Sequence, residues 1–164
     1  MLRSFIINIL VAYCLFGCSL TDKTLSHSDL TVNSTLSMAQ LMEWVIDPAA
    51  DGIWESVSWV SSIKGDQEIY PKTEADWDKL RNSAATLMES THLLMLPGRA
   101  RDNQDWMRAV LRLRKTVENT MVSIKARDID AIFEAGSHID TACEACHLKY
   151  AYFEQKSPTS PSSR

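Results

Sequence analysis

Apolar residues recur every three or four positions along four stretches of the chain, which is the spacing of an α-helix with one buried face. The first stretch runs from about residue 36 to residue 62, and its apolar positions are Met38, Met42, Val45, Ala49, Ile53, Val57 and Val60. Pro48 within it must either kink a long helix or restart one, with Asp47 as the N-cap. No stretch gives a convincing strand pattern.

Two of the other three stretches begin next to residues that can cap a helix. Thr73 follows Pro71, and its side chain can cap the second helix, with Asp76 three positions later. The third stretch starts near Asp102, and Asp128 caps the fourth. Helices joined by short connections, each with one apolar face, predict an all-α fold, an antiparallel four-helix bundle.

Both ends of the chain differ in composition from these stretches. Residues 1–18 include Arg3 and an apolar run too short to span a bilayer comfortably, which indicates an export signal. Residues 19–34 are rich in Ser, Thr and Asp and predict a flexible tether, and the Ser/Pro-rich residues 156–164 predict a disordered tail. The folded domain is therefore expected to comprise residues 35–155.

The end of the signal, Leu15-Phe16-Gly17-Cys18, resembles a bacterial lipoprotein signal. The resemblance implies that Cys18 becomes the lipidated first residue of the mature chain and tethers it to a membrane. The alternative is a secretion signal that is simply cleaved, in which Cys18 has no role. Both alternatives predict a periplasmic protein.

Composition excludes some partners. Hydrophobic residues make up 45% of the chain and charged residues 23%, an ordinary balance for a globular domain with a real core. The formal net charge is −4, and acidic and basic residues are interspersed. Neither nucleic acid nor an anionic membrane surface is therefore a natural partner.

The fourth stretch has the most regular apolar stripe, and it contains the motif Cys143-Glu144-Ala145-Cys146-His147. At about 100° per residue, Cys143 and Cys146 lie roughly 60° apart, and His147 lies about 40° from Cys143. Two thiols on one side of a helix can add to the two vinyl groups of one porphyrin, and the adjacent imidazole can ligate its iron. Cys-x-x-Cys-His in an exported chain therefore predicts attachment of one covalent haem c.

Two other chemical roles for this motif have less support from the sequence. A thioredoxin-type redox pair belongs at a strand-to-helix turn, whereas Cys143 and Cys146 lie late in a long amphipathic helix. A zinc site would need two more ligands, and the chain has no second Cys/His cluster.

A four-helix chain with a single Cys-x-x-Cys-His near its C-terminus resembles the class II cytochromes c, the family of cytochrome c′ and the low-spin cytochromes c-556. The resemblance implies that haem packs inside the bundle between the first and last helices. It also implies that Cys143 and Cys146 form the thioether links and that His147 is the proximal iron ligand. Tyr150 matches the aromatic residue commonly found three positions after that histidine, and Ala151 stands where the family often has arginine.

The same resemblance directs attention to the distal side of the iron. Low-spin members place a methionine from the first helix there, whereas cytochrome c′ places a residue that does not ligate. Met42 is the expected match, with Met38, one turn earlier, as the substitute. The alternative is that both methionines only fill the core. A thioether ligand raises the potential and blocks small ligands, whereas an open site binds NO or CO.

Other candidate residues have weaker support. His138 lies about 180° around the fourth helix from His147 and should face away from the haem. Arg99 or Arg101 could meet a haem propionate, although a solvated arginine is the simpler expectation. The tryptophans are expected mostly in the core: Trp44, Trp54, Trp59, Trp77 and Trp106.

These observations predict a monohaem electron-transfer protein, not an enzyme, that exchanges electrons with redox partner proteins at the haem edge. The resemblance also implies a homodimer formed through the first two helices. Three alternatives remain at this point: a five-coordinate gas-binding haem protein, a thiol-disulfide oxidoreductase that uses Cys143 and Cys146, and a purely structural four-helix lipoprotein.

Overall fold

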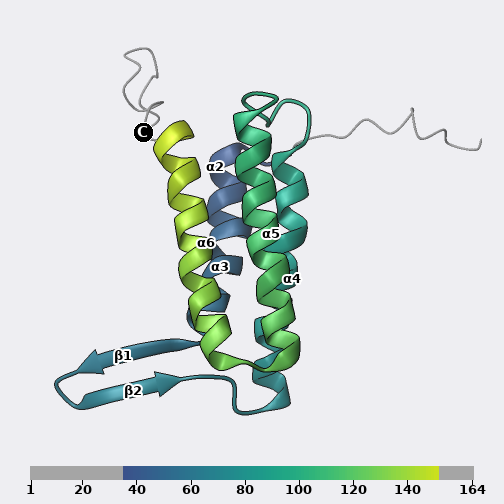
Figure 1. The fold of residues 1–164 in the computed structure, drawn as a ribbon. Helices are drawn as coiled ribbons and strands as arrows, with labels where there is room; N and C mark the ends of the chain where they lie inside the picture. The colour runs from purple at the N-terminus through teal and green to yellow at the C-terminus, as the bar shows by residue number, and fades with distance from the viewer. Residues whose placement is uncertain (1–34, 152–164) are drawn as a thin grey trace, which may run out of the picture. The chain divides into compact units, whose positions relative to one another are not determined.

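The computed structural model describes residues 35–151, in which four helical segments pack side by side and one two-stranded sheet projects from one end (Figure 1). The predicted four-helix bundle is confirmed for this part of the chain. The predicted signal, tether and tail lie outside it, as does the end of the predicted domain. The elements are α2 (Met38–Leu41), η3 (Met42–Ile46), α3 (Asp47–Trp54), β1 (Ser58–Ser62), β2 (Gly65–Ile69), α4 (Glu74–Leu94), α5 (Asp105–Ala126) and α6 (Ile129–Tyr150).

The elements α2, η3 and α3 form one continuous first segment that passes through Pro48. Asp47 has helical dihedral angles, φ −60° and ψ −49°, and its N–H donates to the carbonyl of Met42. That hydrogen bond spans five residues, which makes η3 a π-helical turn. Asp47 is therefore not an N-cap, and of the two expectations for Pro48 the continuous helix is correct.

The expectation that the first helix extends to Ser62 is wrong, as is the expectation of a chain without strands. The helix ends at Trp54, and β1 pairs antiparallel with β2, so that Ser62 lies opposite Gly65. Gly65 has a φ of +107°, which favours glycine and allows the tight reversal between the strands. The aromatic and β-branched pair Trp59-Val60 also favours a strand.

The predicted caps of α4 and α6 are confirmed. Thr73 and Asp76 form a reciprocal capping box at the start of α4. The Asp128 side chain accepts a hydrogen bond from the Ala131 N–H, at 3.0 Å, at the start of α6. The third helix, α5, begins at Asp105, three residues after Asp102. The carboxylate of Asp102 accepts hydrogen bonds from the backbone N–H groups of Gln104 and Trp106 at the start of this helix.

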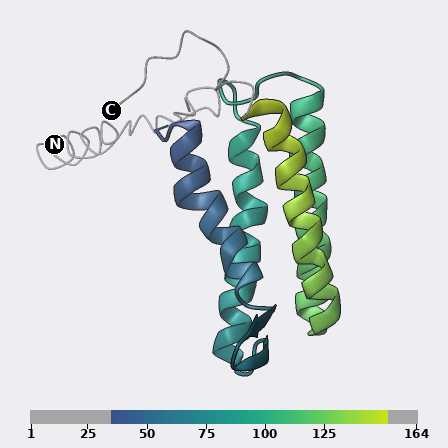
Figure 2. The same cartoon turned by 90° about the vertical axis from the view of Figure 1, so that its left-hand side faces the viewer.

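The core lies between the helices and draws on all four segments. The first segment packs on α4, α4 on α5, and α5 on α6 (Figure 2). Trp77 and Trp106 lie in this core as expected, whereas Trp44 and Trp59 are 55% and 56% exposed, so the expectation for these two is wrong. The large side chains that are completely buried include Leu41, Ile53, Leu80, Leu87, Val110, Val117, Ile132 and Ile139.

None of the helices within residues 35–151 combines the length and the apolar character that a bilayer crossing requires.

Candidate functional site

Cys143, Cys146 and His147 lie toward the C-terminal end of the 22-residue helix α6, between seven and three residues before its last residue. Each of them is half-buried, and Cys143 packs against the hydrophobic core. Both cysteines are free thiols. The motif thus has the helical setting expected from the sequence, with two thiols and an imidazole along one side of the helix.

Cys143 and His147 lie close to Asp47 of the first segment. Burial raises the pKa of the Cys143 thiol to about 11, and the negative charge of Asp47 contributes to the rise. The pKa of Asp47 itself is raised, chiefly by loss of water, while His147 acts on it in the opposite direction. Burial also raises the pKa of Cys146. Because Asp47 belongs to the first segment, these interactions place that segment opposite Cys143 and His147.

One hydrogen bond fixes how the first segment and α6 are aligned. The indole N–H of Trp54 donates to the carbonyl of Gly136 at 3.0 Å. A Cβ atom at Gly136 would lie 3.1 Å from Cδ1 of Trp54, so glycine allows this close approach. Trp54 and Gly136 therefore lie at the same level of two antiparallel helices.

This alignment shows which residues of the first segment lie opposite His147 along the helix axis. His147 is eleven residues beyond Gly136, or about 16 Å along α6 at 1.5 Å per residue. Eleven residues back from Trp54 is Glu43, and Met42 lies one residue further. Cys143, seven residues beyond Gly136, comes level with Asp47, seven residues before Trp54, in agreement with their electrostatic interaction.

Of the two methionines that were considered as distal ligands, Met42 lies at the level of His147. Met38 lies about 6 Å further toward the N-terminal end of the segment, by the rise of four residues. Both side chains are half-buried and pack against the core. Position along the helix therefore favours Met42 over Met38.

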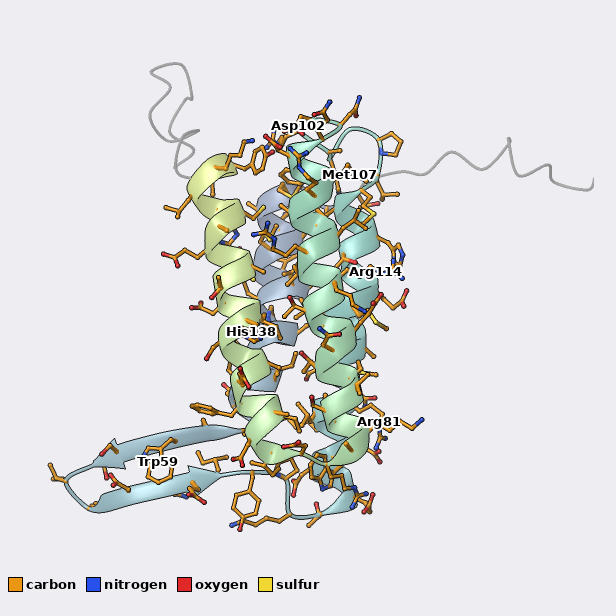
Figure 3. All side chains as sticks on the ribbon, in the orientation of Figure 1. Trp59, Arg81, Asp102, Met107, Arg114 and His138 are labelled. Atoms are coloured by element: carbon orange, nitrogen blue, oxygen red, sulfur yellow. The ribbon has the colours of Figure 1, made fainter. Side chains whose placement is uncertain are left out.

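The end of α6 is held by contacts that the sequence does not reveal. The Tyr150 hydroxyl donates to Asp102 at 2.5 Å, and the two rings of Tyr150 and Trp106 meet edge to face at 4.9 Å between centroids. Lys149 forms an ion pair with Asp105. Asp102 lies at the end of the bundle where α6 terminates (Figure 3). These contacts join the last turn of α6 to the start of α5.

Arg99 does not match the expectation of a solvated arginine. Its side chain is buried, at 8% exposure, and its guanidinium donates to the carbonyls of Leu36 at 3.0 Å and Leu93 at 3.3 Å. Its Nε atom has no hydrogen-bond partner. This burial was not predictable from the sequence, because Arg99 follows a Pro-Gly turn, which is typical of an exposed segment.

The other histidines do not join the motif. His138 is exposed on α6 (Figure 3), as its position around the helix predicts. His92 is also exposed, near Glu89 and Arg114. The remaining histidine, His27, lies outside the described residues.

Within residues 35–151, no three or more His, Cys, Asp and Glu side chains come together in a way that could hold a metal ion. No protein-family model, curated protein or solved structure matches this chain.

Proposed function

We propose that this chain is a monohaem c-type cytochrome that transfers electrons in the bacterial cell envelope. The observation that carries the proposal is the motif from Cys143 to His147. Both thiols and the imidazole lie along one half-buried side of α6, and Cys143 and His147 lie near Asp47 of the first segment. This proposal fits the family resemblance of the sequence, with its single covalent haem c.

The donor set fits this cofactor. The thiols of Cys143 and Cys146 would add to two vinyl groups, each S–H giving one thioether C–S bond and one C–H bond. His147 would supply a neutral nitrogen as the proximal ligand of the iron. Bound haem supplies an iron that gains and loses one electron, which redox partner proteins donate and accept. The helices supply the apolar surroundings that tune the reduction potential.

The thiol-disulfide alternative has less support from the same residues. A redox-active cysteine pair usually has a lowered pKa, often at a helix N-terminus. Here the pair lies toward the C-terminal end of α6, away from the helix N-terminus that stabilises a thiolate. Burial raises the pKa of both thiols, that of Cys143 to about 11. These cysteines are therefore poorly suited to act as nucleophiles at neutral pH.

Location and assembly belong to the proposal. Export to the periplasm rests on the signal in residues 1–18, and the membrane tether rests on Cys18. Electron exchange needs partner proteins, and a homodimer is implied only by the resemblance.

The test is expression of the full chain in a bacterium that attaches haem to exported proteins. We expect a red protein whose mass exceeds that of the processed polypeptide by one haem. Double substitution Cys143→Ala/Cys146→Ala should abolish covalent attachment. His147→Ala should change the absorption spectrum, whereas His138→Ala, an exposed histidine on the same helix, should not. A colourless wild-type protein with two titratable thiols would end the proposal.

The second axial position decides between the two haem functions. If a second protein side chain ligated the iron, the ferrous protein should not bind CO, which is the result expected for the electron-transfer function. A ferrous protein that binds CO avidly would instead point to the gas-binding alternative.

A further inference from the structure

We propose that the π-helical turn η3 rotates Met42 from the core face of the first segment onto the face that meets α6. The thioether of Met42, and not the carboxylate of Glu43, is then presented toward His147. This inference rests on the proposed function, because it concerns the ligand on the second axial side of the iron.

The faces of α3 are defined by its contacts. Trp54 faces α6, since its indole donates to Gly136. Asp47 lies seven residues earlier, within about 20° of Trp54 around the helix, and therefore on the same face. Ile53, at about 100° from Trp54, marks the core face, since it is buried.

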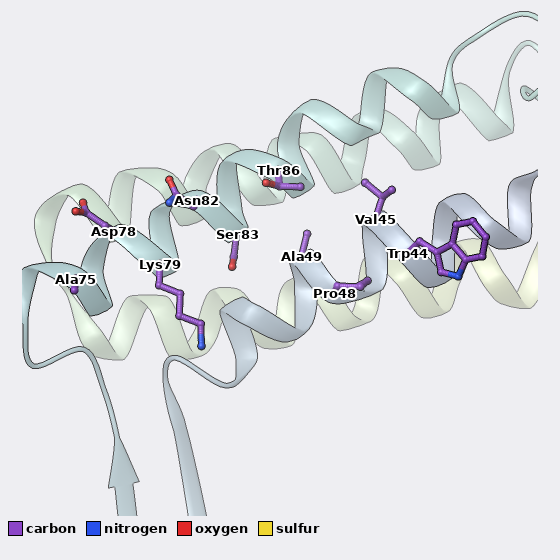
Figure 4. A pocket seen from close by; sticks show the side chains of 10 residues that line it. All are labelled: Trp44, Val45, Pro48, Ala49, Ala75, Asp78, Lys79, Asn82, Ser83 and Thr86. Atoms are coloured by element: carbon purple, nitrogen blue, oxygen red, sulfur yellow. The ribbon is translucent and has the colours of Figure 1, made fainter. Parts of the chain in front are cut away.

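The opposite side of the segment faces α4. The pocket between them is lined from the first segment by Trp44, Val45, Pro48 and Ala49 (Figure 4). Neither Met42 nor Glu43 belongs to this lining. The side of the segment that faces α6 is therefore distinct from the one that faces α4.

A regular α-helix through this segment does not agree with the burial of its residues. At about 100° per residue, it would turn Leu41 to about 120° from Ile53, away from the core. It would also direct Glu43 to within about 20° of Trp54, toward α6, and Met42 to the core face. In the structure Leu41 is completely buried and Glu43 is exposed.

The π turn accounts for both observations. It adds one residue to a turn, and this rotates the residues that precede it and those at its start by about 100° relative to α3. Leu41 then lies within about 20° of Ile53, on the core face, and Glu43 turns to solvent. Met42 comes within about 20° of Trp54, on the face that meets α6. Its half-burial against the core agrees with that position.

Pro48 gives the turn a local cause. A proline inside a helix lacks the N–H group, and its ring collides with the carbonyl four residues earlier, here that of Trp44. The wider turn just before Pro48 relieves this crowding. The direction of Met42 around the helix and its position along the helix axis therefore both place it toward His147 on α6.

The test moves the methionine by one residue and reads the haem spectrum of the full-length holoprotein. Met42→Ala should abolish the methionine-to-iron charge-transfer band and give one CO bound per haem. The double variant Met42→Ala/Glu43→Met should behave in the same way, because position 43 faces solvent. Met38→Ala is the matched control and should keep the wild-type spectrum.

Deletion of Glu43 tests the register from the opposite direction. Removing one residue lets a regular helix direct Met42 toward α6, so the deletion variant should keep the wild-type band and should not bind CO. Circular dichroism reports whether the deletion variant folds. If it does not fold, the spectrum of the double variant Met42→Ala/Glu43→Met is the test of the π turn.

The outcomes separate the two proposals. Wild-type protein without haem overturns the proposed function. Wild-type haem protein that binds CO freely leaves covalent haem intact and overturns the role of Met42. A double variant that keeps the wild-type band shows a regular helix and overturns the π-turn inference, as does a folded deletion variant that has lost the band.

Discussion

Asp102 shows how a single side chain can join two distant segments. One carboxylate oxygen accepts the backbone N–H groups of Gln104 and Trp106, each at 2.9 Å, and the other accepts the Tyr150 hydroxyl. These donors, the Tyr150 hydroxyl first, lower the pKa of Asp102 to about 2. The carboxylate therefore joins the start of α5 to the last turn of α6, next to the Cys-x-x-Cys-His motif.

The lowered pKa of Asp102 predicts a particular pH dependence of stability. Because the folded protein holds the carboxylate ionised below its ordinary pKa of about 4, its contribution is complete above that pH and is lost as the pH falls toward 2. Asp102→Asn should lower the free energy of unfolding at pH 7 more than at pH 3. Urea unfolding at both values measures this, with Glu134→Gln on α6 as the control. An equal loss at both pH values would contradict the prediction.

At the scale of elements, the first segment differs most from its sequence pattern. Val57 and Val60 continue the helical spacing, yet the helix has already ended and Val60 lies in an exposed strand. Two apolar positions cannot distinguish a last helical turn from the start of a hairpin. The sequence pattern does not reveal the π turn either. The apolar residues before the turn keep a spacing of three and four positions, although the turn rotates them to a different face of the helix.

The contact between α3 and α4 depends on a glycine. A Cβ atom at Gly52 would lie 2.2 Å from Oγ and 3.0 Å from Cβ of Ser83. Gly52→Ala should therefore lower the free energy of unfolding by about 1–2 kcal/mol, because overpacking outweighs the gain in helix propensity.

A double-mutant cycle with Ser83→Gly tests this contact. The second change removes the colliding atoms, so the double variant should lose about 1 kcal/mol less stability than the two single losses together. Chemical denaturation measures all four proteins. Additive losses would show that the helices do not meet at this point.

At the scale of the whole described region, the core belongs to the helices, and the hairpin lies at the end remote from the motif (Figure 1). Nearly all hairpin residues are exposed, and Ile63 at its tip is fully so. A two-stranded hairpin has little stability of its own. The bundle should therefore fold without it.

Replacement of residues 59–68 by a short Gly/Ser linker tests this independence. We expect unchanged helix content by circular dichroism and a loss of less than about 1 kcal/mol in unfolding free energy, because few buried contacts disappear. The haem spectrum should also stay unchanged. A bundle that fails to fold, while a variant with only Ile63→Ser folds normally, would show that the hairpin supports the core.

The sequence by itself determined the features that depend on neighbours within a turn or two. These are the caps at Thr73 and Asp128, the periodic stripe of α6, and the placement of two thiols and an imidazole on one side of that helix. Such features are readable because helix geometry relates each residue to those three or four positions away.

Only the tertiary structure decided which residue of the first segment faces the motif. The alignment of Trp54 with Gly136, the link from Asp102 to Tyr150 and the burial of Arg99 join residues far apart in sequence. Periodicity does not encode such contacts, since they depend on how the helices pack. The turn that brings Met42 rather than Glu43 toward α6 depends on the same packing, because Leu41 can be buried only in that register.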